Sequence, residues 1–134
     1  MARTYDYDLV CIGSGPAGQR AAVQSAKLGK SAAVIEKDPC LGGVCLGTGT
    51  IPSKTLREAV LFFNRLAARP DRARSAQADA RPTAVQLLAK VGEVLTREQD
   101  VIEAQLRRND VAVIRGEASF ADPHTLQVRQ GDGW

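Results

Sequence analysis

The sequence has few aromatic residues, few cysteines, a single histidine and no long apolar run, and each shortage excludes a class of protein. Aromatic residues make up 4% of the 134 residues and the arginines are dispersed, so we predict no nucleic-acid interface despite a net charge of +3. No apolar run approaches the roughly 20 residues of a membrane span, and the aspartates of the N-terminal segment make it a poor signal peptide. Three cysteines, an odd number, argue against a secreted disulfide framework. We expect a cytoplasmic protein without a membrane partner, a nucleic-acid partner or a metal site.

The order of apolar and glycine-rich segments is typical of an α/β protein. Residues 6–12 form a β-leaning run that stops at glycine, residues 16–28 have a helical pattern with a small-residue face, and residues 31–35 form a second apolar run. Strand, glycine turn, helix and strand in this order predict a βαβ unit that opens a parallel, Rossmann-like sheet.

The rest of the chain predicts a glycine-rich loop, two helices and further strands. The loop covers residues 38–49, a helix follows over 52–68, and the polar segment 68–82 is expected to be a mobile surface connection. Thr83 is the predicted N-cap of a helix that ends near residue 108. Strands are expected at 111–116 and 124–130, so that a strand-rich region begins near the C-terminus.

Each long helix has an apolar stripe at 3–4-residue spacing. On the first helix the predicted buried residues are Leu56, Val60, Phe63 and Ala67. On the second they are Leu87 or Leu88, Val91, Leu95, Ile102 and Leu106.

The glycine turn after the first strand reads Gly13, Ser14, Gly15, Pro16, Ala17 and Gly18, which is the G-x-G-x-x-G pattern, and Glu36 ends the next strand. This context is that of a dinucleotide-binding fingerprint, in which the glycines permit a tight turn, close approach of a pyrophosphate and helix–strand packing. An ionised Glu36 can bind ribose hydroxyls and would repel a 2′-phosphate, which favours FAD or NAD over NADP. The alternative is a glycine-rich turn that binds no ligand.

The glycine-rich loop resembles the redox-active segment of the flavin disulfide reductases of class I, in which G-G-x-C-x-x-x-x-C-x-P-S-K follows the FAD fingerprint. Here Gly42, Gly43, Val44 and Cys45 are followed by Thr50, Ile51, Pro52, Ser53 and Lys54. Cys40 and Cys45 have the same C-x-x-x-x-C spacing, but the flanking glycines and the Pro-Ser-Lys segment make Cys45 the first family cysteine and put Thr50 in the place of the second. We assign no role to Cys40, and Cys11 is expected to be a small buried hydrophobe.

The threonine, together with the opening segment, makes the chain similar to the soluble pyridine nucleotide transhydrogenases of this superfamily. The resemblance implies a bound FAD, NAD(P)H and NAD(P)+ as substrates, and hydride exchange between NADPH and NAD without a dithiol relay. It implies that the glycine turn binds the pyrophosphate and Glu36 the ribose, and that Cys45, Thr50 and Lys54 approach the isoalloxazine. The remaining FAD-lining residues that it implies are Lys37, Asp38, Gly42, Gly43 and Val44, with Gly116 and Ala118 beside the adenine.

Proteins of this superfamily are several times larger and contain an NAD(P)-binding domain and a C-terminal dimerisation domain. The resemblance therefore implies that residues 1–134 are the N-terminal part of an FAD-binding domain, catalytically incomplete by themselves, with homo-oligomers expected only when the C-terminal domain is present. Two alternatives stay open. One is a dihydrolipoamide dehydrogenase-like flavoprotein that has lost its redox disulfide, and the other is a truncated module that binds FAD or nothing.

Overall fold

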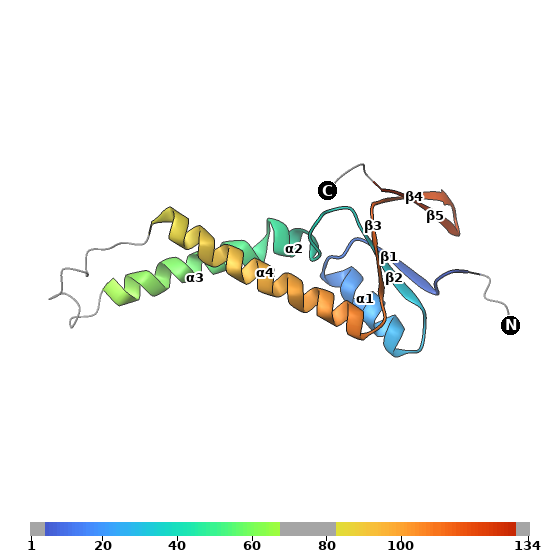
Figure 1. Cartoon of the computed structure of the whole chain (residues 1–134), viewed down its shortest axis with the longest axis horizontal. Coiled ribbons are helices and arrows are strands. Elements are labelled where there is room, and N and C mark those ends of the chain that lie inside the picture. Colours follow the sequence, from blue (N-terminus) through green and yellow to red (C-terminus); the bar gives the residue numbers. More distant parts are fainter. Residues whose placement is uncertain (1–4, 68–82, 131–134) are drawn as a thin grey trace.

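Glycine turns and caps divide the chain into helices and strands that were largely expected from the sequence. The structure is a computed structural model, and it describes residues 5–67 and 83–130. In chain order the elements are β1 (Leu9–Ile12), α1 (Pro16–Lys27), β2 (Ala32–Glu36), α2 (Gly43–Gly47), α3 (Thr50–Ala67), α4 (Ala84–Arg108), β3 (Ala112–Arg115), β4 (Glu117–Asp122) and β5 (Thr125–Arg129) (Figure 1). The predicted connection 68–82 lies outside the described residues.

A three-stranded parallel sheet and a separate hairpin organise the fold. The sheet has the order β1-β2-β3, with Cys11 opposite Val34 and Glu36 opposite Arg115. β4 and β5 pair antiparallel, and His124 lies in the turn between them. The predicted βαβ unit and α/β class are confirmed.

One face of the sheet carries the apolar core. Ala32 and Val34 of β2 pack with Ala22 and Val23 of α1 and with Leu106 of α4, and all five are buried. Cys11 packs against this cluster, and burial raises the pKa of its thiol, as expected for a small apolar side chain. The core therefore fixes the carboxyl ends of β1 and β2 beside α1.

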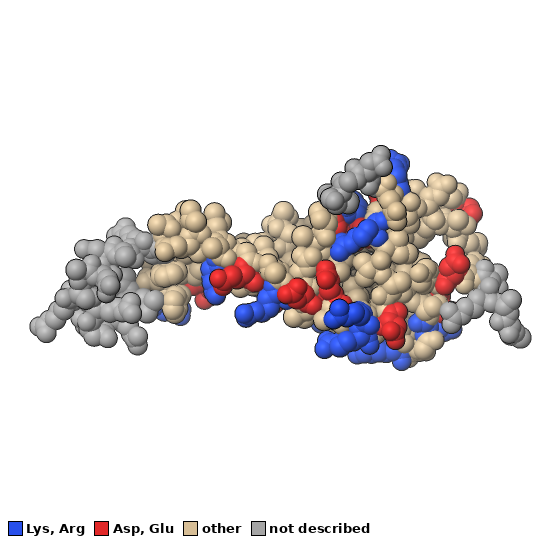
Figure 2. All heavy atoms as spheres, viewed as in Figure 1, with Lys and Arg blue, Asp and Glu red and all other residues tan. Residues whose placement is uncertain are grey.

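α4 begins at a capping box in which Thr83 Oγ1 accepts from the Gln86 N–H and the Gln86 side chain accepts from the Thr83 N–H. Its predicted apolar side is confirmed, with Leu87 rather than Leu88 turned inward and Leu106 only 1% exposed. Lys and Arg alternate with Asp and Glu along this helix on the face seen in Figure 2. None of the helices in the described part of the chain is both long and apolar enough to cross a membrane.

Two predictions about α2 and α3 were wrong. The glycine-rich loop contains a short helix, α2, because Leu41 and Leu46 are buried on either side of its start. On α3 the buried position is Ala59, whereas Leu56 and Val60 are exposed. Within the described residues α3 packs mainly against α4 and α2, and the two long helices extend away from the sheet (Figure 1). Phe63 is partly buried as predicted, and the Ala67 side chain is outside the described set.

Candidate functional site

The turn between β1 and α1 has the shape that the glycine pattern predicts. Gly13 has φ +96°, which favours glycine, and a Cβ on Gly18 would overlap the carbonyl oxygen of Gly13. Gly15 is different, because its φ of −63° suits any residue and a Cβ there would meet nothing within 4 Å. No contact with the residues that the structure describes requires glycine at position 15, so the open space above it is available to a ligand.

The N-terminus of α1 faces the same turn. Pro16 occupies the first helical position, no described side chain caps the helix, and no acidic residue lies in its first turn. The unpaired N–H groups and the positive end of the helix dipole therefore favour an anion at this point. This is the arrangement expected for Ala17 and Gly18 in a pyrophosphate site.

The carboxylate of Glu36 is held at the end of β2 by a network of hydrogen bonds. Its Oε2 accepts from the N–H of Ser14 at 2.8 Å and from the Ser14 hydroxyl, and its Oε1 accepts from the N–H of Asp38 at 3.0 Å. The Ser14 oxygen in turn accepts from the N–H of Gly42 at 2.9 Å. Ser14 is 0% exposed and Glu36 is 5% exposed, so this network is internal to the protein.

The network keeps Glu36 ionised. Burial alone would raise the pKa of this carboxyl, but the hydrogen bonds from Asp38 and Ser14, and a further one from the backbone of Lys37, outweigh burial and lower it below its ordinary value. The site therefore presents a negative charge that can accept hydrogen bonds from hydroxyl groups.

Five of the predicted cofactor residues line one cavity of about 250 Å³. They are Gly13, Glu36, Lys37, Gly116 and Ala118, and Ile12, Ile35 and Glu117 complete the lining. Gly116 is brought there by a hydrogen bond from its N–H to the carbonyl of Glu36 at 2.9 Å. The structure thus unites residues from three segments that are far apart in the sequence.

The second predicted loop contacts the glycine turn. A Cβ on Gly43 would lie 3.0 Å from the Cα of Gly15, so the two glycines pack against one another. Gly42 has φ +118°, and a Cβ there would meet Leu46 at 2.7 Å. These contacts place the start of α2 beside the open space over Gly15.

The chain packs closely against α2 at Gly49, the residue before Thr50. A Cβ on Gly49 would lie 2.6 Å from the carbonyl oxygen of Val44 and 3.4 Å from the Cα of Cys45. Thr50 follows immediately and begins α3, while Cys45 is a partly buried free thiol on α2. Cys40 is also a free thiol and is exposed.

Lys54, Val44 and Asp38 are among the predicted residues that do not line the 250 Å³ cavity. Lys54 is exposed and lines a groove between α3 and α4, together with Thr55, Glu58 and Phe62. Val44 is 76% exposed. Asp38 is exposed as well, and it contributes through its backbone, which donates to Glu36 and accepts from Arg115.

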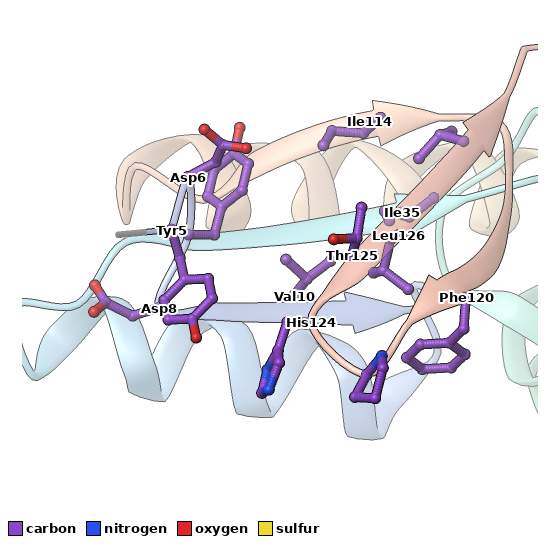
Figure 3. Close-up of a pocket in the computed structure, with 13 residues that line it drawn as sticks. Tyr5, Asp6, Asp8, Val10, Ile35, Ile114, Phe120, His124, Thr125 and Leu126 are labelled. Carbon is purple, nitrogen blue, oxygen red and sulfur yellow. The ribbon is translucent and has the colours of Figure 1, made fainter. Parts of the chain in front are cut away.

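A larger cavity, of about 730 Å³, was missed from the sequence. It lies between the hairpin and the face of the sheet opposite the core, where Val10, Ile35 and Ile114 face Leu126 (Figure 3). Val128 of the hairpin also lines this cavity. Tyr5 and His124 contact each other at its rim, with ring centroids 5.8 Å apart. The available signal was that the three strands are apolar at successive positions. Because alternate residues of a strand point to opposite faces of a sheet, such strands have apolar side chains on both faces. Within residues 5–67 and 83–130, no group of His, Cys, Asp or Glu side chains is placed to hold a metal ion.

The sequence model of one protein family, the pyridine nucleotide-disulphide oxidoreductases, matches residues 7–133 of the chain. The chain belongs to this family.

Relatives within the family agree with the superfamily resemblance. A soluble pyridine nucleotide transhydrogenase of Mycobacterium bovis (strain BCG / Pasteur 1173P2) is 52% identical over 123 residues, which is 92% of this chain and 26% of the relative. The soluble pyridine nucleotide transhydrogenase of Enterobacter sp. (strain 638) is 37% identical over 99% of this chain and 28% of its own length. This member of the family thus spans about a quarter of the length of the curated relatives it matches.

A solved structure has the same fold. The Cu(II) complex of the HOCl-induced flavoprotein disulfide reductase RclA from Escherichia coli is 28% identical, with a TM-score of 0.76 over 99% of this chain and 26% of that protein. The Rossmann-like architecture of the family is therefore present in these residues.

Proposed function

We propose that these residues form the N-terminal part of the FAD-binding domain of a cytoplasmic, Si-specific NAD(P)+ transhydrogenase. The observation that carries the proposal is the junction of the open glycine turn with an ionised, buried Glu36 at the mouth of one cavity. Relatives named soluble pyridine nucleotide transhydrogenase support the assignment of the reaction.

The residues at hand fit an FAD molecule in three ways. The open space over Gly15 and the uncapped N-terminus of α1 suit a pyrophosphate. Glu36 suits the hydroxyls of a ribose, and the cavity wall formed by Gly116 and Ala118 suits the adenine. When bound, the flavin supplies reversible hydride exchange between nicotinamide nucleotides.

The residues near Cys45 bear on whether the protein could reduce a disulfide substrate. Gly49 packs against α2, and Thr50 follows it at the position where the family resemblance puts the second cysteine of a redox pair. A threonine hydroxyl forms no disulfide, so NADPH and NAD+ are the substrates that we propose, with no disulfide substrate. Lys54 would supply positive charge near the isoalloxazine once its groove is covered by the rest of a protein of family length, and oligomers would form through that same remainder.

The test uses protein expressed from the complete reading frame. Purified protein should be yellow, and it should transfer hydride from NADPH to an NAD analogue without a disulfide acceptor. Lipoamide reduction in place of hydride exchange would refute the transhydrogenase reaction. It would mean that a dihydrolipoamide dehydrogenase-like protein, for which the similarity to a flavoprotein disulfide reductase speaks, keeps disulfide chemistry despite Thr50. A colourless protein that does not bind added FAD would refute the cofactor assignment and favour a non-catalytic module.

A further inference from the structure

A buried hydroxyl lies at the junction of the three segments that form the proposed cofactor site. Ser14 Oγ donates to Glu36 Oε2 and accepts from the N–H of Gly42. These residues belong to the glycine turn, the end of β2 and the loop before α2. One fully buried side chain therefore connects the proposed pyrophosphate site, the ribose carboxylate and the segment that leads to Cys45.

The two oxygens of Glu36 have different surroundings. Oε2 accepts two hydrogen bonds from Ser14, one from its N–H and one from its hydroxyl, which accounts for both lone pairs of that oxygen. Oε1 accepts from the backbone N–H of Asp38, and the backbone of Lys37 also donates to this carboxylate. A ribose hydroxyl that binds this carboxylate has to reach Oε1.

We propose that Ser14 is a positioning residue for the ribose end of the site, whose hydroxyl orients the Glu36 carboxylate and ties it to the loop at Gly42. The proposal rests on the FAD-binding function proposed above. It differs from the direct cofactor contact that the fingerprint predicts for Ser14, because both donors of this residue are engaged with Glu36.

The charge of Glu36 depends on the same contacts. Loss of the Ser14 hydroxyl removes one hydrogen bond that lowers the pKa of Glu36 and leaves burial, which raises it, unchanged. The other charged groups around this carboxyl are Lys37 and Asp38 in the chain, Arg115 opposite on β3 and Glu117 in the cavity wall. The acid limit of FAD binding should therefore move to higher pH in Ser14→Ala.

A matched control exists at the other end of the same two strands. Ser31 makes the same pair of bonds to a carboxylate, because both its N–H and its hydroxyl donate to Asp8 Oδ2 at 2.8 Å. Asp8 lines the larger cavity and not the one at Glu36. Ser31→Ala thus removes a serine–carboxylate bond of the same pattern, at an exposed position, without touching the proposed FAD site.

The experiment measures the FAD dissociation constant of the apoprotein, prepared from the complete reading frame, by flavin fluorescence between pH 4 and 8. Ser14→Ala should weaken FAD binding by about 10- to 150-fold at pH 7, the range that corresponds to roughly 1.5–3 kcal/mol for a hydrogen bond to a charged group. Ser31→Ala should bind FAD like the wild type. In a Glu36→Gln background, Ser14→Ala should have a clearly smaller effect, because its partner is no longer charged.

A second measurement separates this proposal from the FAD function. The carboxyl carbon of Glu36, followed by NMR in the cofactor-free protein, should titrate at higher pH in Ser14→Ala than in the wild type. If Ser14→Ala does not fold, Ser14→Cys replaces it, because a thiol of similar size is only a weak donor. A shifted titration in a protein that does not bind FAD would refute the proposed function and support the Ser14–Glu36 link. Unchanged FAD affinity and an unchanged titration would overturn the role of Ser14 and leave the FAD function in place.

Discussion

Substituting Gly15 with alanine should separate the affinity for FAD from the stability of the fold. The backbone of Gly15, with φ −63° and ψ 173°, is accessible to alanine, and the added methyl would meet no protein atom within 4 Å. Lower entropy of the unfolded chain stabilises such a variant by about 0.4–1 kcal/mol. Alanine is a poorer N-cap than glycine by a similar amount, so the two effects offset and the free energy of unfolding should change by less than about 0.5 kcal/mol.

Binding should respond differently, because the methyl would occupy the space that we assign to the pyrophosphate. Overpacking by one methyl in a close contact costs about 1–3 kcal/mol, which corresponds to roughly 5- to 150-fold weaker binding. Urea unfolding and flavin fluorescence titration of the same preparation measure the two quantities. Gly92→Ala is the control, since Gly92 lies within α4, also with nothing within 4 Å of a Cβ, and its substitution should leave FAD affinity unchanged. Wild-type affinity in Gly15→Ala would refute the assignment of this turn to the pyrophosphate.

Three further predictions concern neighbouring residues. Gly18→Ala should lower the free energy of unfolding by about 1–3 kcal/mol in urea titrations, because its methyl would overlap the Gly13 carbonyl oxygen; an unchanged midpoint would contradict the tight turn. The lowered pKa of Glu36 means that its ionised form contributes stability above its ordinary value of 4.5, and this contribution is lost as the pH falls through the lower folded-state pKa. The stability difference between the wild type and Glu36→Gln should therefore shrink in denaturation curves recorded below pH 4.5, and a constant difference would argue against an ionised Glu36. Thr50→Cys in the FAD-loaded protein should give a long-wavelength charge-transfer band on two-electron reduction, Thr50→Ser should not, and no band in either would mean that the alignment of Thr50 with the second cysteine is wrong.

The parts of the site that follow from local backbone chemistry could be predicted from the sequence. Gly13, Pro16 and Gly18 mark the turn and the first helical position through conformational preferences that act within a few residues. Glu36 could be located because the end of a strand is marked by its apolar run. That Gly116 and Ala118 lie beside these residues could be predicted only from the family resemblance, since nothing in their own segment indicates a cavity.

The features that could not be predicted from the sequence depend on packing between distant segments. The helix α2 has two glycines in five residues, and it forms because Leu46 is buried, which no local propensity indicates. Leu56 and Val60 have a helical spacing that predicts burial, but whether a stripe is buried depends on which neighbours exist. The bond between Ser14 and Glu36 spans 22 positions and joins two common polar residues, so the sequence alone gives no sign of it.

The pairing of β2 with β3 also determines the order in which the chain can fold. Ala33 lies opposite Ala112, so the partner of β2 is synthesised only after α2, α3, the connection and α4. During synthesis, the β1–α1–β2 unit thus emerges with one apolar strand edge unpaired, and such edges are templates for aggregation. Sheets closed by contacts this distant in sequence fold slowly. A nascent chain with these residues at its amino end has to keep the β2 edge protected until residues 112–115 have left the ribosome.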